Sequence, residues 1–343
     1  MVRDFSEEDG FFRSDNFISN ETSYLHIVDK LEQLGARGGA YIGVGPEQNF
    51  TYIAKVRPRI AFIVDIRRQA MIQHLMFKAL FQLSDTRAQF LSRLFSKPLA
   101  GERAPGARSA IEEILDYFGE TPATDEAYAG NLAAVRKAIE EDFQFPLDAR
   151  DRAALDYVYT AFRDENLNIQ YKTSGTNWGN VPWSSFPSLK NLILQPDLHG
   201  RLGNYLASES DYAFVRDLER RNQVIPVVGD FAGPKALVSI ADYLKKNGYP
   251  VTAFYTSNVE QYLFASASFS AFVENVRKLP IGEKSLFIRA FPNMRDPHPA
   301  QIPPHRLTTL LQLMTVFLKD YDQGLYEDYL KLVTLHYIAP EQP

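Results

Sequence analysis

The stretch "GGAYIGVGPEQNFTYIAKVRPRIAFIVDIRRQ", residues 38–69, joins two apolar runs through a helix-like segment. Ala40 to Val44 has the pattern of a short buried strand, and the spacing predicts a helix over 47–56. Ile60 to Val64 then predicts a second buried strand, with Asp65 at its carboxyl end. This order of strand, helix and strand indicates a parallel pair joined by a crossover helix.

The same alternation returns late in the chain. Continuous apolar strands separated by helices predict a mostly parallel sheet with helices on both faces, an α/β fold. In addition to a third helix over 70–83, the expected elements are a strand at 224–228, a helix from Gly233 through Leu244, a strand at 251–255, a helix around 259–263 and a strand at 285–290.

Composition narrows the class of protein. The chain has 343 residues, 45% of them hydrophobic, which is enough to bury a large core. The net charge of −5 argues against a surface built to hold nucleic acid or anionic membrane. With no cysteine, disulfides, zinc–cysteine sites and thiol chemistry are excluded. The N-terminus lacks an apolar run of secretory length and no run could span a bilayer, so we expect a cytoplasmic protein.

We expect residues 1–343 to form a single domain with two additions. Residues 84–222 separate the second and third strands and are too long for an ordinary connection, so they predict a mainly helical insertion or cap, with helices at 108–118, 126–141 and 149–165. Residues 1–35 predict an N-terminal lead with a helix capped by Asn20 or Thr22. At the other end we expect a helix at 305–319 and a strand at 330–338.

The two glycines after the first strand suggest a ligand. Open parallel sheets bind ligands outside the carboxyl ends of their strands, where Gly43 and Gly45 would let a ligand approach the backbone. Asp65 could accept hydrogen bonds from ribose hydroxyls. A dinucleotide fingerprint needs a third glycine where Gln48 stands, and the Glu47 carboxylate would repel a diphosphate. No P-loop is present. A ligand with adenine and ribose but no phosphate fits best.

The run Gly43-Val44-Gly45-Pro46, followed by a helix, a strand and Asp65, resembles the class I S-adenosylmethionine-dependent methyltransferases. The resemblance implies a Rossmann-like sheet with S-adenosylmethionine as cofactor. It implies that Gly43, Gly45 and Glu47, which takes the place of a third glycine, lie under the methionine end and that Asp65 binds the ribose. Gly229-Asp230-Phe231 resembles the segment of that family at the adenine edge.

The resemblance also implies that Tyr255 and Asn258 face a methyl acceptor, with the methyl group moving by in-line displacement. We expect a small-molecule or protein acceptor and neither a nucleic acid nor a membrane as partner. The chain lacks the acidic residue that the family usually carries before its first glycine. A non-catalytic protein that binds adenosyl ligands is therefore the alternative function, and a nicotinamide-dependent oxidoreductase is disfavoured by Gln48 and Glu47.

Purely structural roles compete with several of these assignments. The glycines could serve only a tight turn, and Asp230 could cap the next helix. Ser257 and Glu260 match a capping box, which we favour over a functional role. His74 is expected to be packed or half-exposed and not a ligand.

Other residues carry weaker signals. His199 is a possible general base, although a surface position is favoured. A metal site at Asp296, His298 and His305 is not expected. The tryptophan loop, 171–186, is either a lid, an acceptor platform or an ordinary packed loop, and the polar segment 13–21 either closes over the cofactor or only precedes a helix.

Overall fold

The sheet organises the molecule. The computed structural model describes residues 1–171, 186–293 and 297–340, and within these ranges one six-stranded sheet has the order β3–β2–β1–β4–β5–β6. The first five strands pair in parallel, and β6 pairs antiparallel with β5. The strands are β1 (Ala40–Gly43), β2 (Ile60–Asp65), β3 (Val224–Val228), β4 (Val251–Ser257), β5 (Ile281–Pro292) and β6 (Leu307–Leu313). The protein is thus an α/β protein with a mixed, mostly parallel sheet.

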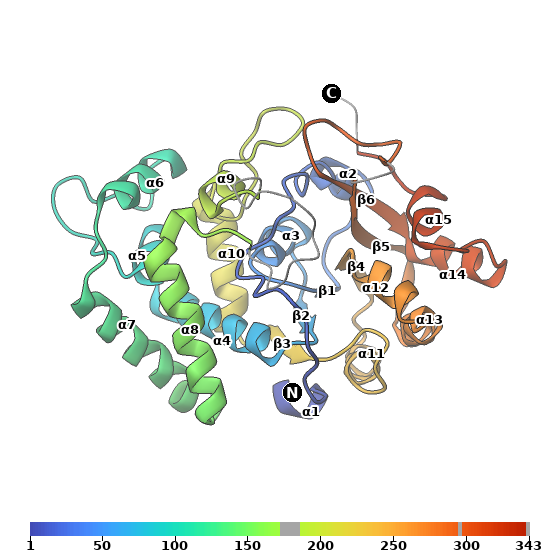
Figure 1. Cartoon of the computed structure of the whole chain (residues 1–343), viewed down its shortest axis with the longest axis horizontal. Coiled ribbons are helices and arrows are strands. Elements are labelled where there is room, and N and C mark those ends of the chain that lie inside the picture. Colours follow the sequence, from blue (N-terminus) through green and yellow to red (C-terminus); the bar gives the residue numbers. More distant parts are fainter. Residues whose placement is uncertain (172–185, 294–296, 341–343) are drawn as a thin grey trace.

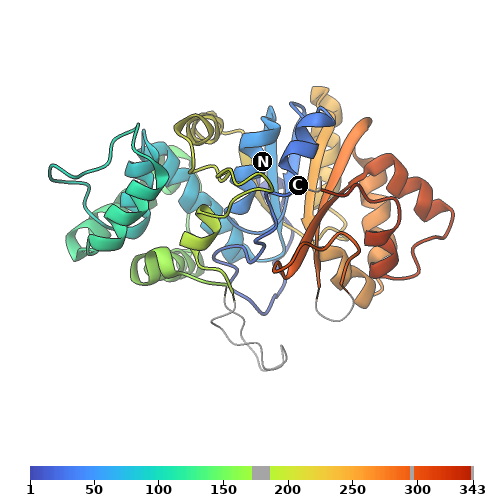
Figure 2. The ribbon, with the colours of Figure 1, turned by 90° about the horizontal axis from the view of Figure 1, so that it is seen from above.

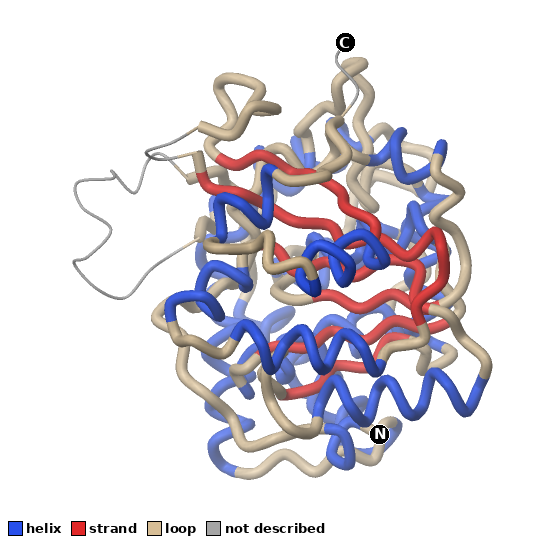
Figure 3. Tube along the Cα trace, turned by 90° about the vertical axis from the view of Figure 1, so that its right-hand side faces the viewer, coloured by secondary structure: helices blue, strands red, loops and turns tan. Residues whose placement is uncertain are grey.

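Helices surround this sheet (Figures 1 and 3). They are α1 (Val2–Phe5), α2 (Val28–Gln33), α3 (Gln48–Val56), α4 (Arg68–Leu83), α5 (Arg87–Phe95), α6 (Ile111–Glu120), α7 (Asp125–Lys137), α8 (Ala149–Glu165), α9 (Leu189–Ile193), α10 (Glu209–Arg220), α11 (Ala236–Asn247), α12 (Val259–Ala265), α13 (Phe269–Lys278), α14 (Met314–Asp322) and α15 (Tyr329–Thr334). A π-turn (Ala138–Asp142) follows α7, and a 3-10 turn (Asn166–Asn168) follows α8.

Both faces of the sheet are buried, because successive side chains of each strand enter opposite cores. Along β2, Ala61 and Ile63 join the core formed with α3, α4, α8 and α10. Ile60, Phe62 and Val64 join the core formed with α11, α13 and α14. In Figure 2 the helices between β2 and β3, in cyan to green, and the last helices, in red, lie on opposite sides of the molecule. This double burial explains the continuous apolar runs in the sequence.

The first half of the fold was predicted well. The helix expected over 47–56 is α3, the helix over 70–83 is α4, and the five strands expected between residues 40 and 290 are present as β1 to β5. Between β2 and β3 the described residues are mostly helical, and α6, α7 and α8 correspond to the three helices predicted there.

The prediction for the C-terminal end is wrong. Residues 307–313 form β6 instead of a helix, and the helix α14 begins only at Met314. Leu307, Leu310, Leu311 and Met314 recur at helical spacing, but in β6 Leu310 and Leu311 enter the two opposite cores of the sheet. The predicted strand at 330–338 is instead α15, capped by the side chain of Asp328. Only Ile338 pairs, through an isolated bridge to Leu311.

The N-terminal lead contains less helix than predicted. The helix α2 begins at Val28, and neither Asn20 nor Thr22 caps it. Residues before it make tertiary hydrogen bonds instead: Tyr24 Oη donates to the carbonyl of Leu192 at 2.8 Å. Ordered tertiary contacts therefore replace the first turns of the expected helix.

The sheet order defines where a ligand can bind. From β1 the chain continues to β2 and β3 on one side, and β4 and β5 lie on the other side. The strand order therefore reverses between β1 and β4, and the loops after these two strands diverge to opposite faces. Such a switch point leaves a crevice outside the carboxyl ends of the strands.

None of the helices within the described ranges combines the length and the apolar character needed to cross a membrane.

Leu311→Ala should lower the free energy of unfolding by about 2–5 kcal/mol, because the side chain is fully buried in β6. Leu330→Ala is the matched control: Leu330 is 37% exposed, and its loss should change stability by less than about 0.5 kcal/mol. Urea denaturation of both variants measures the difference. Equal losses would contradict the assignment of β6 and α15.

Candidate functional site

A pocket of about 480 Å³ lies over the carboxyl ends of β1 to β4, at the switch point. A volume of this size suits a ligand as large as a nucleoside derivative. Its walls come from the loops after the four strands, from Tyr171 and from the N-terminal segment. The lining segments fall within residues 11–21, 44–46, 64–67, 229–231 and 255–266.

The loop after β1 presents one open glycine to this pocket. Gly45 lines the pocket with a φ of +79°, a conformation that glycine adopts readily, and a Cβ placed on it would meet no atom within 4 Å. Gly43 differs, because a Cβ there would lie 2.0 Å from the Oδ1 atom of Asn49. Only Gly45 has the open approach that was predicted for both glycines, and Gly43 is required for internal packing.

Two buried side chains hold this loop in place. The Nδ2 amide of Asn49 donates to the carbonyls of Val44, Gly45 and Pro46 at 2.9, 3.1 and 2.8 Å. The Nε2 atom of His74 lies 2.9 Å from the carbonyl of Gly45, which can only accept, so Nε2 carries the proton. Burial lowers the pKa of His74 to about 4 and keeps it neutral. His74 is thus packed, the first of the two positions expected for it.

At the end of β2, Asp65 lines the pocket but is already paired. Both of its oxygens accept from the Arg67 guanidinium, Oδ1 from Nε at 3.0 Å and Oδ2 from Nη2 at 2.9 Å. The backbone N–H of Arg67 also donates to Oδ1. Since each carboxylate oxygen has two lone pairs, Oδ1 is saturated and Oδ2 retains one acceptor position. A ribose hydroxyl could therefore donate one hydrogen bond to Asp65 Oδ2, whereas an unpaired aspartate could accept from two hydroxyls through both oxygens.

At the end of β3, Gly229, Asp230 and Phe231 all line the pocket. Gly229 is required for packing, because a Cβ there would lie 2.2 Å from that of Ala236. The Oδ1 atom of Asp230 accepts from the backbone N–H of Ala232 at 2.8 Å, a local turn, while its exposed side chain leaves Oδ2 available. Asp230 does not cap the following helix.

That cap comes from the N-terminal segment. The Glu7 carboxylate accepts from the backbone N–H groups of Asp230, Lys235 and Ala236 at 3.2, 2.7 and 2.7 Å. These are the groups that would otherwise bind an anion at the start of α11. The protein itself therefore fills this position with a carboxylate.

At the end of β4, a hydrogen-bond network centres on Glu21. Its Oε1 atom accepts from Tyr255 Oη at 2.8 Å and from the Ser257 hydroxyl, and its Oε2 atom accepts from Gln48 Nε2 at 2.9 Å. Ser257 holds a left-handed backbone with φ 53°, a strained conformation that is found preferentially at functional sites. Asn258 lines the pocket beside it.

The capping box predicted here is wrong. Asn258, not Ser257, is the N-cap residue of α12, and no side-chain cap bond forms. Ser257 is turned toward Glu21 instead. Glu260 is fully buried in an ion pair with Arg289 at 2.8 Å. Ser257 and Glu260 therefore do not form the capping box, because each bonds a residue distant in the sequence, Glu21 and Arg289 respectively.

Two buried acids adjoin the glycine loop. Burial raises the pKa of the Glu47 carboxyl from 4.5 to about 8, and the nearby Glu21 carboxylate raises it further. Burial likewise raises the pKa of Glu21, although hydrogen bonds from Ser257, Gln48 and Tyr255 oppose the shift. Glu47 accepts a bond from the backbone N–H of Ser19 at 3.3 Å. It does not itself line the pocket.

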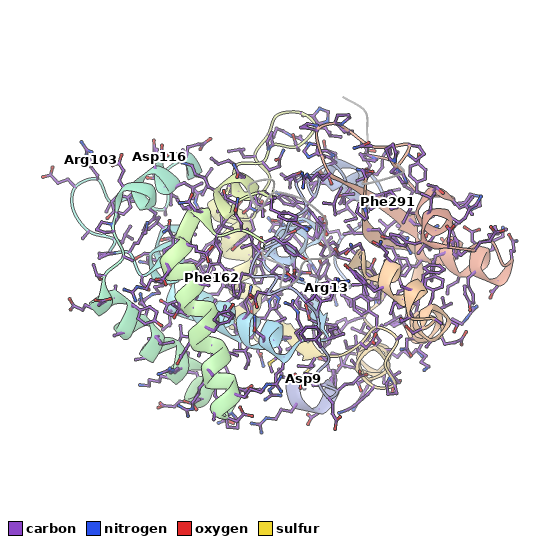
Figure 4. All side chains as sticks on the ribbon, viewed as in Figure 1. Asp9, Arg13, Arg103, Asp116, Phe162 and Phe291 are labelled. Carbon is purple, nitrogen blue, oxygen red and sulfur yellow. The ribbon has the colours of Figure 1, made fainter. Side chains whose placement is uncertain are left out.

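The N-terminal segment forms one wall of the pocket, and its closure over a cofactor stays a prediction. The Arg67 guanidinium donates to the carbonyls of Ser14 and Asp15 at 2.7 Å each. The centroid of the Phe12 ring lies 6.0 Å from the Cζ atom of Arg67. It lies 5.4 Å from the centroid of the Tyr262 ring, and the two rings are nearly perpendicular. Figure 4 labels Asp9 near α1 and Arg13 near the centre of the view, along the path of this segment.

The structure brings together most of the predicted site residues. Those lining the pocket are Gly45, Asp65, Gly229, Asp230, Phe231, Tyr255 and Asn258, whereas Gly43 and Glu47 do not line it. His199 lies outside it and pairs with Asp29 at the surface, 3.2 Å away. His298 and His305 bond to Val333 and Thr22. Asp296 and residues 172–185 of the tryptophan loop lie outside the described residues, and within the described ranges no group of three or more acidic or histidine side chains is arranged to hold a metal.

Several residues of the site were not predicted. Glu7 and Glu21 act far from their positions in the sequence, and Arg67 bonds the distant carbonyls of Ser14 and Asp15 as well as the nearby Asp65. A signal existed for Asn49, which follows the glycine turn at a distance suited to bond its carbonyls. The polar segment before Tyr24 was noted, but its acids were not assigned.

The fold and this pocket define an α/β protein with a cavity at the carboxyl edge of its mostly parallel sheet. A family model described as "Domain of unknown function (DUF7790)" matches residues 16–329, and the chain belongs to this family. The match includes the pocket segments from Asn16 onward. No curated protein matches the chain.

Glu47→Gln should flatten the pH dependence of stability. In the unfolded chain this carboxyl ionises above pH 4.5, whereas in the folded protein it stays protonated to about pH 8. Between these values the folded state binds more protons, so wild-type stability falls as pH rises, by at most about 1.4 kcal/mol per pH unit. Unfolding measured from pH 5 to 8 tests this, with the exposed Glu126→Gln as control. Parallel curves for the wild type and Glu47→Gln would contradict it.

Asp65→Ala should destabilise the fold by about 3–5 kcal/mol, because it leaves the buried Arg67 guanidinium without its counter-charge. The double variant Asp65→Ala with Arg67→Ala should lose less than the sum of the single losses. Urea denaturation of all four proteins measures this coupling. Additive losses would show that the pair contributes nothing as a unit.

Proposed function

We propose that this protein binds S-adenosylmethionine in the pocket over β1 to β4 and transfers its methyl group to a small-molecule or protein acceptor. The observation that carries the proposal is the pocket itself: its volume of about 480 Å³, its place at the switch point and its acidic lining. In this view the sheet is Rossmann-like, and residues 84–222 are an insertion that helps to choose the acceptor.

The charge of the pocket favours a cationic ligand. The charged side chains that line it, within the described ranges, are Glu21, Asp65, Arg67 and Asp230. Asp65 and Arg67 neutralise each other at 2.9 Å. The remaining acids give an environment that attracts positive charge, and S-adenosylmethionine carries a sulfonium and an ammonium group.

The helix starts around the pocket disfavour a phosphate. The N–H groups at the start of α11 already bind the Glu7 carboxylate. At the start of α3 the N-cap residue is Glu47, another acid. Dinucleotide cofactors place their diphosphate at such a helix start, so these acids argue against NAD.

Each part of the cofactor has a matching part of the pocket. The methionine end would lie on the open backbone of Gly45, and a ribose hydroxyl would donate to the remaining acceptor position of Asp65 Oδ2. The adenine would lie against Phe231, with the free Oδ2 atom of Asp230 available to its amino group. Tyr255 and Asn258 would then face the acceptor.

Methyl transfer places modest demands on the protein. The acceptor attacks the methyl carbon in line, the carbon–sulfur bond breaks, and its electron pair neutralises the sulfonium. Alignment of the two reactants is the main contribution required, and a rigid pocket supplies it. The bonds of Asn49 and His74 to the glycine loop provide rigidity of this kind.

One observation favours a second candidate, a protein that binds adenosyl ligands without turnover. Tyr255 already donates to Glu21, and burial raises its pKa well above its ordinary value, so it is poorly suited to remove a proton from an acceptor. With Tyr255 unable to act as a base, binding and catalysis become separable questions.

Calorimetry on the full chain with S-adenosylmethionine, S-adenosylhomocysteine and NAD tests the proposal. We expect binding of the first two and none of NAD. Gly45→Ala should weaken binding at least tenfold, because its methyl group enters the pocket. Gly38→Ala is the matched control: Gly38 has a φ of +77°, open space around a Cβ, and no place in the pocket lining.

The outcomes separate the candidates. NAD binding alone, or equal effects of the two glycine variants, would overturn the proposed site. Binding of both adenosyl ligands without methyl transfer to a broad panel of small molecules and proteins would favour the non-catalytic protein.

A further inference from the structure

Glu21 brings a carboxylate into the pocket, and the hydrogen bonds described for it all come from neutral donors. Tyr255 and Ser257 both donate to Oε1, which fills the two lone pairs of that oxygen. Oε2 accepts only from Gln48, so it retains one acceptor position. The three donors fix the orientation of the carboxylate but leave part of its capacity unused.

We propose that Glu21 is the anchor for a positively charged group of the ligand, an ammonium or a sulfonium. The inference deepens the proposed function and rests on it for the identity of the whole ligand. It assigns to the N-terminal segment the acid that the first strand, at Ala40 to Ile42, does not supply.

The surroundings of Glu21 provide no counter-charge of their own within the described ranges. The one basic side chain lining the pocket, Arg67, is bound to Asp65. The titratable groups that face Glu21 from the elements packed around it are Tyr41 of β1, Glu47 and Tyr52 of α3, Tyr255 of β4 and Tyr329 of α15. All of these are acidic or neutral. An ionised Glu21 is therefore a desolvated charge that a ligand cation would stabilise.

The walls of the pocket fit the same ligand chemistry. Phe12, Phe231 and Tyr262 line it with aromatic surface, whose faces attract cations in a desolvated site. An anionic group would meet repulsion from Glu21 and Asp230. A neutral group would leave the Glu21 carboxyl to keep its proton, which the burial-raised pKa already favours.

Binding of a cation should consequently be coupled to the release of a proton from Glu21. A cation favours the ionised carboxylate, so Glu21 releases a proton as the ligand binds, and affinity rises with pH until Glu21 is ionised in the empty pocket. S-Adenosylmethionine affinity measured from pH 5 to 8 should rise, whereas the affinity for methylthioadenosine, which lacks both charged groups, should stay constant. This comparison uses the wild-type protein alone.

Glu21→Gln tests the anchor directly by calorimetry. The substitution should lower the affinity for S-adenosylmethionine at least tenfold and change the affinity for methylthioadenosine less than twofold. Glu47→Gln is the matched control, because it removes a neighbouring buried acid that does not line the pocket and should leave both affinities unchanged. Glu21→Asp, which keeps the charge, should retain more affinity than Glu21→Gln.

A probe independent of adenosine separates this inference from the proposed function. Trimethylsulfonium chloride should raise the melting temperature of the wild type, relative to sodium chloride at the same ionic strength, and should not do so for Glu21→Gln. If this holds while adenosyl ligands fail to bind, the anchor stands and the proposed function falls. If adenosyl ligands bind Glu21→Gln and wild type equally, the anchor is overturned and the proposed function remains. If neither trimethylsulfonium nor S-adenosylmethionine distinguishes the wild type from Glu21→Gln, the role of Glu21 as the anchor is also overturned.

Discussion

Four neighbouring parallel strands end at one edge of the sheet, and the loops that follow them carry polar backbone groups that need partners. The rest of the site depends on how this constraint is met. Asn49 bonds the carbonyls after β1, Arg67 and Asp65 bond each other after β2, and Glu7 bonds the N–H groups after β3. With these groups satisfied by side chains, the edge can remain hollow without the loops collapsing into it.

The N-terminal segment supplies much of this support, although it lies outside the sheet. Glu7 attaches it to α11, the carbonyls of Ser14 and Asp15 attach it to Arg67, and Glu21 attaches it to β4. The pocket is thus complete only when this segment is docked. A loss of these bonds would remove one wall of the pocket and expose the loops that follow the strands.

The sequence predicted the sheet edge well and its chemistry less well. Continuous apolar runs such as Ile60 to Val64 are typical of strands buried on both faces, and this one forms β2. At Leu310 the same reasoning failed, since a strand and a helix can show identical spacing over so few residues. Glu21 was not identifiable as a site residue because its partner Tyr255 lies more than two hundred positions away.

Glycine illustrates why a motif predicts a place better than a role. Gly43, Gly45 and Gly229 all lie in or next to the pocket, yet only Gly45 has open space where a side chain would be. The other two are required by Asn49 and Ala236, that is, by internal packing. The loops after β1 and β3 therefore contain both packing and pocket-facing glycines, and the substitution that separates a change in the pocket from a change in packing is the one at the position with no internal neighbour. In this protein that position is Gly45.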